Sequence, residues 1–304
     1  MAIPVIVVGS VALDSVSTVK GETKKALGGS ASHFSLAASN FAPVHVIGVV
    51  GTDFPDAFRK VLARRQINLD GLKVVDGKTF HWKGSYDKDF RNATTIATEL
   101  NVFENFKPVL SSKDRSHNVV FLANIDPDLQ MDVLRQLKSP RLVACDTMNY
   151  WIERKKASLI RLLKKVHILF INEEEIRQLT GQYNLIAAGR RVLKMGPRVI
   201  IIKKGDSGAM LMTAKHIITV PAFPVESVTD TTGAGDTFAG GFIGSLARSG
   251  KWNDIEELKR AMAYGTIMSS FNVEDFSVHR VSRLKMAEIK KRLAAFVKSL
   301  SVKI

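Results

Sequence analysis

The chain has 304 residues, of which 45% are hydrophobic and 24% charged, proportions that fit one large α/β domain of a globular protein. Its single cysteine, Cys145, excludes an intramolecular disulfide framework and fits a reducing compartment. The formal charge of +15 raises the question of a nucleic-acid, membrane or small anionic partner.

Short apolar runs alternate with helical patterns along most of the chain. The apolar runs are rich in Val, Ile and Leu, which is typical of strands buried on both faces of a sheet. Strands are expected at 5–8, 44–50, 119–123, 142–144, 168–171 and 199–202. Helices are expected at 32–40, 55–65, 127–137, 157–166, 173–179, 185–195, 253–270 and 283–300. This order predicts right-handed crossovers and an α/β fold with a doubly wound, mostly parallel sheet flanked by helices.

The pattern changes between residues 71 and 106. An Asp-Gly turn at 76–77 lies between strand formers, and the β-rich composition continues through 94–98 without helical patterns between. We therefore expect a small separate sheet, to which residues 11–26 could add strands.

Polar residues follow almost every predicted strand. Because ligands bind beyond the carboxyl ends of the strands in such sheets, these residues are expected to line a site. They are Asp14, Asn124, Asp146, Asn172 and the run Lys203-Lys204-Gly205.

The segment 229–241 reads T-D-T-T-G-A-G-D-T-F-A-G-G. Gly233, Ala234 and Gly235 precede Asp236 and an apolar run, which predicts a tight turn that opens a buried helix. The first N–H groups of a helix and the positive end of its dipole form an anion site. Asp236 at its mouth would take a proton from a hydroxyl while the amides hold a transferring phosphoryl group. The alternative is a flexible loop in which Asp236 caps the helix.

Residues 230–238 resemble the C-terminal signature of the ribokinase-like (PfkB-type) carbohydrate kinases. The resemblance implies a ribokinase-like fold, with ATP as donor, Asp236 as catalytic base and the amides of Gly233, Ala234 and Gly235 as anion hole. It also implies one kinase domain over 1–304, with a β-sheet lid inserted at about 11–26 and 73–104. Such a lid excludes water from the site, and its pairing with a second copy predicts a possible homodimer.

Residues 27–33 resemble the N-terminal signature of the family, in which a Gly-Gly pair opens a helix. The resemblance implies that Gly28, Gly29 and Asp14 contact hydroxyls of the acceptor, since a carboxylate can accept two hydrogen bonds. Asn124 is expected in the same site. His33 stands where many members carry Asn, and it is either a substrate ligand or simply a helix residue.

Further matches concern the nucleotide. Asn172 and Glu175 match an Asn-x-x-Glu string that is linked in the family to Mg²⁺ and the ATP phosphates. These two residues would contact Mg²⁺ in part through water. The alternative is an acidic first turn of a helix, which favours carboxylates in any case. Lys204, Gly205 and Gly208 resemble the turn beneath the nucleotide, although a plain β-turn also fits.

The remaining assignments also follow from the resemblance. Asn272 belongs to the adenine pocket, and Thr232, Gly233 and Gly235 are expected to contact ATP. Asp230 and Thr232 would contact a monovalent cation, with K⁺ as the candidate.

Two further segments bear on detail. Residues 48–54 resemble a Gly-x-x-Gly-x-Asp landmark, and here a helix capped by Thr52 or Asp53 is expected. Many members carry Asp-x-Asn-x-Arg where this chain has Asp146 but Tyr150 in place of the basic residue. Because Arg would clamp a phosphate, its absence disfavours a phosphorylated acceptor.

The sequence thus predicts an ATP-dependent phosphotransferase, a carbohydrate kinase that phosphorylates a primary hydroxyl of a sugar. A nucleoside kinase on the same fold is the closest alternative. A non-catalytic sugar- or nucleic-acid-binding protein is the alternative from another class. The basic residues are spread over predicted helices, so a nucleic-acid partner is not expected. Neither a signal-peptide pattern nor a membrane-spanning run is evident, so we expect a cytoplasmic location and no membrane partner.

Overall fold

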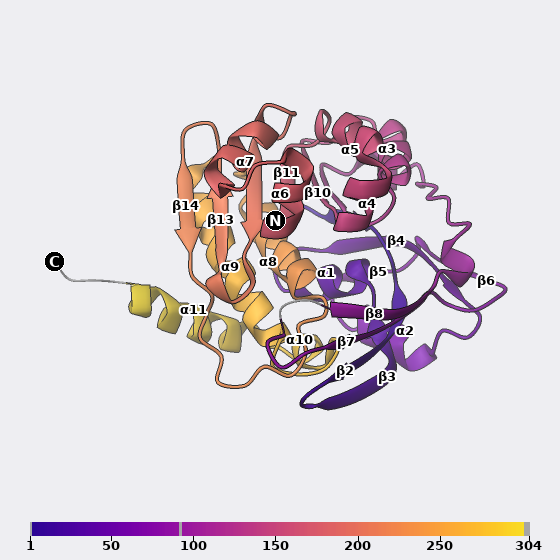
Figure 1. Ribbon diagram of the computed structural model, residues 1–304. Helices are drawn as coiled ribbons and strands as arrows, with labels where there is room; N and C mark the ends of the chain where they lie inside the picture. Colours follow the sequence, from indigo (N-terminus) through magenta and orange to yellow (C-terminus); the bar gives the residue numbers. More distant parts are fainter. Residues whose placement is uncertain (1, 91–92, 301–304) are drawn as a thin grey trace.

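The computed structural model describes residues 2–90 and 93–300 and contains one large and one small sheet (Figure 1). The large sheet consists of β1 (Val5–Val8), β4 (Val44–Gly51), β5 (Ile67–Asn68), β6 (Leu72–Val75), β9 (Val119–Leu122), β10 (Leu142–Asp146), β11 (Ile168–Asn172), β12 (Val199–Lys203), β13 (Ala209–Met212) and β14 (Ile217–Val220). Its order is β14-β13-β12-β11-β10-β9-β1-β4-β5, with β6 paired to β4. The pairs from β12 to β5 are parallel, and the two pairs involving β13 are antiparallel.

The helices are α1 (Ser30–Ala38), α2 (Asp56–Ala63), α3 (Pro127–Gln136), α4 (Asn149–Arg154), α5 (Lys156–Leu163), α6 (Glu173–Thr180), α7 (Leu185–Leu193), α8 (Ala234–Ser249), α9 (Ile255–Asn272), α10 (His279–Ser282) and α11 (Met286–Leu300). The doubly wound α/β fold is confirmed, and each expected strand and helix has a counterpart within a few residues. Strand β5, helices α4 and α10 and the hairpin β13–β14 were not predicted. No helix within the described ranges is long and apolar enough to cross a membrane.

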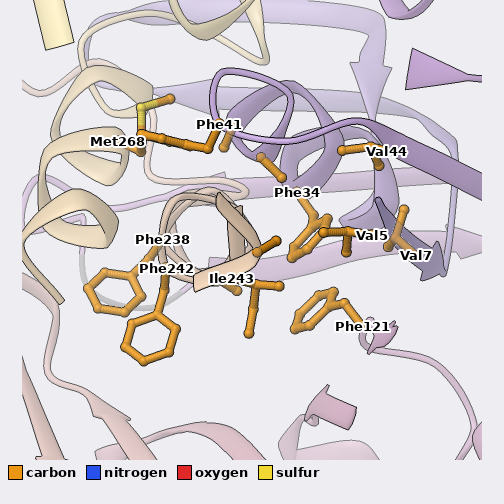
Figure 2. Packing of buried hydrophobic residues seen from close by; sticks show 14 of the residues in the cluster. Val5, Val7, Phe34, Phe41, Val44, Phe121, Phe238, Phe242, Ile243 and Met268 are labelled. Carbon is orange, nitrogen blue, oxygen red and sulfur yellow. The ribbon is translucent and has the colours of Figure 1, made fainter. Parts of the chain in front are cut away.

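Alternate residues of the central strands bury into two separate cores, one on each face of the large sheet. Val5 and Val7 of β1 belong to the core that includes residues of α1, α8 and α9, whereas Ile6 and Val8 belong to the core that includes residues of α3, α5, α6 and α7. Figure 2 shows the first core, in which the rings of Phe34 and Phe121 stack with centroids 4.1 Å apart. Burial on both faces explains why these strands read as continuous apolar runs.

Helices α1 and α8 approach so closely that two glycines of α8 have no room for a side chain. A Cβ at Gly240 would lie 2.4 Å from the carbonyl oxygen of Phe34, and one at Gly244 would lie 3.0 Å from Ala38. The small residues in the apolar run after Asp236 are therefore a packing requirement. They let the middle of α8 pack directly against the second half of α1.

The small sheet has the order β3-β2-β7-β8 and comprises β2 (Ala12–Thr18), β3 (Gly21–Gly28), β7 (His81–Tyr86) and β8 (Ala93–Glu99). Strands β2 and β7 are parallel, and the outer pairs are antiparallel. It stands apart from the large sheet in Figure 1. This confirms a separate small sheet that includes strands from the 11–26 segment. Residues 73–75 were expected in it, but they belong to β6, which pairs with β4 of the large sheet. The single-domain division with an inserted lid stays a prediction.

The expected cap of the helix after residue 54 is wrong. Helix α2 begins after Pro55, and neither Thr52 nor Asp53 caps it. Instead, one carboxylate oxygen of Asp53 accepts both the N–H and the O–H of Thr79 at 2.7 Å. Asp53 therefore holds Thr79, just before β7, in place. Because its carboxylate is engaged in these two hydrogen bonds, it does not cap α2.

Candidate active site

The segment 229–241 forms the predicted turn and helix start. Gly233 is the residue before α8 and has φ 71°, a left-handed conformation that glycine adopts at little cost. Asp236 lies in the first turn of α8. Among the three amides predicted to form an anion hole, that of Ala234 donates to the carbonyl oxygen of Thr231 at 3.2 Å. The turn thus holds one amide in place beside the other two.

Asn272, the last residue of α9, holds this turn in place through two hydrogen bonds. Its Nδ2 donates to the carbonyl oxygen of Thr232 at 2.8 Å, and its Oδ1 accepts from Thr237 Oγ1 at 2.9 Å. The same Oδ1 lies 3.1 Å from Nδ1 of His33. The His33 ring lies so close to Gly233 that a Cβ there would be 2.3 Å from it. His33 and Asn272 therefore support the backbone of the turn.

Asp230 also stabilises the turn. Its Oδ1 accepts the N–H of Thr232 at 2.8 Å and its Oδ2 accepts the N–H of Ser277 at 3.1 Å. The carboxylate, which is fully buried, thereby ties the segment before α8 to the segment before α10. These bonds account for Asp230 without requiring a bound cation.

A buried ion pair lies beneath Gly235. Nζ of Lys203 donates to both carboxylate oxygens of Asp146, at 2.7 and 3.0 Å, and it would lie 3.0 Å from a Cβ at Gly235. Burial opposes the charge of Lys203, but the neighbouring carboxylates of Asp146 and Glu175 outweigh it and raise the pKa of Lys203. The lysine thus stays cationic beside the amides of the turn.

The environment of Asp236 is that of a base for neutral pH. Loss of hydration and the nearby charge of Asp146 raise its pKa to about 7, while Lys203 opposes the shift. A carboxyl with this pKa can be ionised near pH 7 and still be basic enough to accept a proton. Its position next to the helix N-terminus allows proton removal and anion stabilisation at one place.

Asp14 belongs to the same electrostatic site. Its Oδ2 accepts the N–H of Gly29 at 3.3 Å, and a Cβ at Gly28 would lie 1.9 Å from that oxygen. Burial raises the pKa of Asp14 to about 7, and the charges of Asp230 and Asp236 act in the same direction. The structure therefore brings together Asp14, the Gly-Gly turn and Asp236, which are far apart in sequence.

Asn172 and Glu175 form a capping box at the start of α6. The side chain of each accepts the backbone N–H of the other, both at 2.8 Å. Burial raises the pKa of Glu175 to about 7, with Lys203 opposing and Asp146 adding to the shift. The helix-cap alternative is thus realised, and Glu175 also lies in the electrostatic neighbourhood of Lys203.

Two other predicted contacts have structural partners. Gly208 closes the turn after β12, because its carbonyl oxygen accepts the N–H of Lys204 at 2.8 Å. Gly205 lies in open space, where an added Cβ would meet nothing within 4 Å. A Cβ at Gly208 would lie 2.1 Å from the carbonyl oxygen of Val220. Oδ1 of Asn124 accepts from Nε1 of Trp151 at 3.0 Å, so Asn124 contacts α4.

The small sheet reaches the turn through side chains. Thr18 donates to the carbonyl oxygen of Thr229 at 3.0 Å, and the hydroxyls of Tyr86 and Thr232 lie 3.3 Å apart. Beside these contacts lies an open cavity of about 620 Å³, lined by Ser17, Thr18, Val19, Tyr86, Asp87, Lys88 and Asp89. The small sheet thus contacts the turn directly at the end of β7.

Sequence reasoning missed the role of Lys203. It favoured Lys204 because both lysines follow an apolar run, and a single run does not reveal which of two adjacent side chains turns inward. In the structure Lys203 pairs with Asn172 across β12 and β11, so both stand at the same sheet edge, but this register is not visible in the sequence. The link between His33 and Asn272 spans 239 positions and has no local signature.

Comparisons with known proteins show the family to which this chain belongs. A family model described as pfkB family carbohydrate kinase matches residues 4–281. The chain is 28% identical over 249 residues to a cytidine kinase of Thermococcus kodakarensis, covering 80% of this chain and 88% of that protein. It is 33% identical over 224 residues to an uncharacterized sugar kinase of Archaeoglobus fulgidus, covering 70% and 86%. The structure of Arabidopsis thaliana ribokinase with ribose and ATP is similar with a TM-score of 0.77, at 22% identity over 96% and 99% of the two chains.

Proposed function

This chain belongs to the pfkB family of carbohydrate kinases, and we propose that it transfers the γ-phosphoryl group of ATP to a hydroxyl of a sugar or nucleoside, with Asp236 as the base. One observation carries the proposal: the Asp236 carboxyl, with its pKa raised to about 7, stands in the first turn of α8 beside the amides of Gly233 and Gly235. ATP as donor is supported by the family and by the similar ribokinase structure with ribose and ATP.

The proposed reaction is one in-line displacement. Asp236 accepts the hydroxyl proton of the acceptor as its oxygen attacks the γ-phosphorus. The bond from phosphorus to the bridging oxygen breaks, and ADP leaves with that electron pair. The amides of Gly233 and Gly235, the dipole of α8 and the Lys203 ammonium stabilise the charge on the transferring group. Asp14 and the Gly28-Gly29 backbone orient the acceptor.

Mg²⁺ fits the oxygen donors near α6, where Glu175 keeps one carboxylate oxygen outside the capping box. Asn172 and Glu175 would hold it, in part through water, and it would neutralise charge on the ATP phosphates. Lys204, Gly205, Gly208, Thr232 and Asn272 would surround the nucleotide. We also propose K⁺ at Asp230 and Thr232, whose test is the rate in potassium against that in tetramethylammonium salts.

A free sugar is the first candidate acceptor, because the family is that of carbohydrate kinases and Asp14 with the Gly-Gly turn would contact sugar hydroxyls. A nucleoside is the second, and the specific observation that favours it is the relative named cytidine kinase, of which the alignment covers 88%. The open cavity beside Tyr86 offers volume for a group larger than a sugar ring. Asn124 and His33 are candidates for contacts that distinguish the two classes.

The test is ADP formation from Mg-ATP with free sugars, sugar phosphates and nucleosides, each measured beside the Asp236→Asn variant. One acceptor that stimulates ADP formation only in the wild-type protein would support the proposal and name its class. A wild-type protein that binds no ATP would overturn it. A complex with labelled RNA or DNA that forms at near-physiological ionic strength and weakens as salt is added would instead support the non-catalytic alternative.

Two assignments concern the surroundings of the enzyme. We propose a homodimer through the small sheet, whose edge strand β8 is largely exposed. A molar mass from light scattering equal to that of one chain would contradict it.

We propose the cytoplasm as the compartment of the enzyme because the reaction consumes ATP, and fractionation of cells tests this.

A further inference from the structure

His45, Asp114 and His117 form a cluster away from the phosphoryl-transfer site. His45 is the second residue of β4, and Asp114 and His117 lie in and just after the short 3₁₀ helix Asp114–Ser116, which precedes β9. They therefore stand at the amino ends of β4 and β9, whereas Asp146 and Lys203, the two charges that act on Asp236, are the last residues of β10 and β12. The cluster needs an explanation of its own.

The geometry of the three side chains suits one shared cation. One nitrogen of each imidazole and one carboxylate oxygen all lie within 4.8 Å of one another. Asp114 Oδ1 is 3.6 Å from Nδ1 of His45. Three atoms this close share a centre no more than about 2.8 Å from each, so shifts of under about 1 Å would give zinc bond lengths.

Second contacts hold the three side chains in place. Oδ2 of Asp114 accepts from Ser111 Oγ at 2.6 Å, which leaves Oδ1 directed at the histidines. Nδ1 of His117 lies 3.1 Å from the backbone oxygen of Asp114, and an Nδ1–H that donates to it leaves Nε2 as a metal ligand. Such outer contacts orient ligands in known metal sites.

Charge and burial point the same way. The side chains of His45, Asp114 and His117 are only 16%, 13% and 8% exposed, so they are desolvated but reachable. Asp70 favours a cation near His45 and Lys113 opposes it.

We propose that His45, Asp114 and His117 bind a divalent transition-metal ion of the Zn²⁺ class, with water completing a four-coordinate site. Two imidazoles and one carboxylate are donors that zinc accepts and that Mg²⁺ seldom selects. The ion would tie the segment before β9 to the amino end of β4. It would support the large sheet from the end opposite to the reaction.

The test is equilibrium dialysis of the full-length, tag-free protein against Zn²⁺ in the presence of excess Mg²⁺, with metal content measured by mass spectrometry. We expect about one Zn²⁺ per wild-type chain and at least a tenfold weaker affinity in His45→Ala and His117→Ala. The exposed His216→Ala is the matched control and should bind as the wild type does. Co²⁺ substitution should give the intense visible absorption of a tetrahedral site.

Asp114→Asn preserves shape if a histidine variant does not fold, and it should also lose Zn²⁺ and the Co²⁺ spectrum. Two results would overturn the proposal. In one, the wild type binds no more Zn²⁺ than the His45→Ala/His117→Ala double variant. In the other, excess Mg²⁺ displaces the bound Zn²⁺, which would indicate an oxygen site elsewhere.

Discussion

The ammonium of Lys203 donates to both carboxylate oxygens of Asp146, at 2.7 and 3.0 Å, directly beneath Gly235 in the turn that opens α8. The Lys203 side chain is 20% exposed and that of Asp146 is 4% exposed. The carboxylate therefore needs the lysine, and the lysine keeps a positive charge where a phosphoryl group would arrive. Both charges act on Asp236: that of Asp146 raises its pKa and that of Lys203 lowers it.

Lys203→Met should raise the pKa of Asp236, since it removes the cation that opposes the shift. The acid limb of the kcat/KM profile should move to higher pH, and kcat should fall about 10²-fold or more because a charge facing the phosphoryl group is lost. Steady-state kinetics between pH 5.5 and 9 measure both effects.

The matched control is Lys204→Met, one residue along in the turn after β12, which should leave the acid limb in place. Unfolding in urea should show Lys203→Met destabilised by about 3 kcal/mol, because Asp146 is left as an unpaired buried charge. An acid limb unchanged in Lys203→Met would refute the electrostatic link to Asp236.

Gly233→Ala should damage both stability and activity. The substitution meets a left-handed φ of 71° and a Cβ only 2.3 Å from the His33 ring. Gly181→Ala is the matched control, because Gly181 has φ 69° and a Cβ there would meet nothing within 4 Å. The control should lose about 1 kcal/mol from the backbone alone. Gly233→Ala should lose clearly more in urea unfolding, and equal losses would contradict the contact with His33.

Asp14→Asn should stabilise the folded protein at pH 8 while weakening acceptor binding. The folded-state pKa of Asp14, about 7, exceeds the ordinary value of 3.8, so the folded state binds more protons between these pH values. Stability therefore falls as pH rises from about 4 to 7, and Asn removes that loss. We expect a gain on the order of 2 kcal/mol at pH 8 that shrinks towards pH 4.

Thermal or urea unfolding of Asp14→Asn at pH 4.5 and pH 8 measures this difference. Asp76→Asn, in an exposed turn, should show none. A variant that is less stable than the wild type at both pH values would mean that the Gly29 N–H bond to Asp14 outweighs the burial of its charge.

The sequence predicted the fold well because its signals are local. Buried parallel strands read as Val- and Ile-rich runs, and the turn at 229–241 has the glycines that its left-handed start requires. The β13–β14 hairpin escaped because its strands are short and only β13 is buried throughout. Helix α4 escaped because it has six residues and only Ile152 of them is buried.

The candidate site was predictable in its parts and not in its connections. Asp14 and Asp236 stood out by motif, but their mutual influence depends on how β2 and α8, which are distant in the sequence, pack together. The choice of Lys203 over Lys204 depends on side-chain direction at the end of β12. The assignment of Asn272 to the adenine pocket stays a prediction, while its bonds to Thr232 and Thr237 give it a structural duty as well.

The most direct test of the central claim is single-turnover phosphoryl transfer from labelled ATP to the best acceptor in wild type and Asp236→Asn, with ATP binding measured in parallel. The amide keeps the shape of Asp236 but cannot accept the proton. We predict unchanged ATP affinity within about threefold and a transfer rate lower by about 10³-fold. A folded Asp236→Asn variant that keeps most of the wild-type transfer rate would contradict the account.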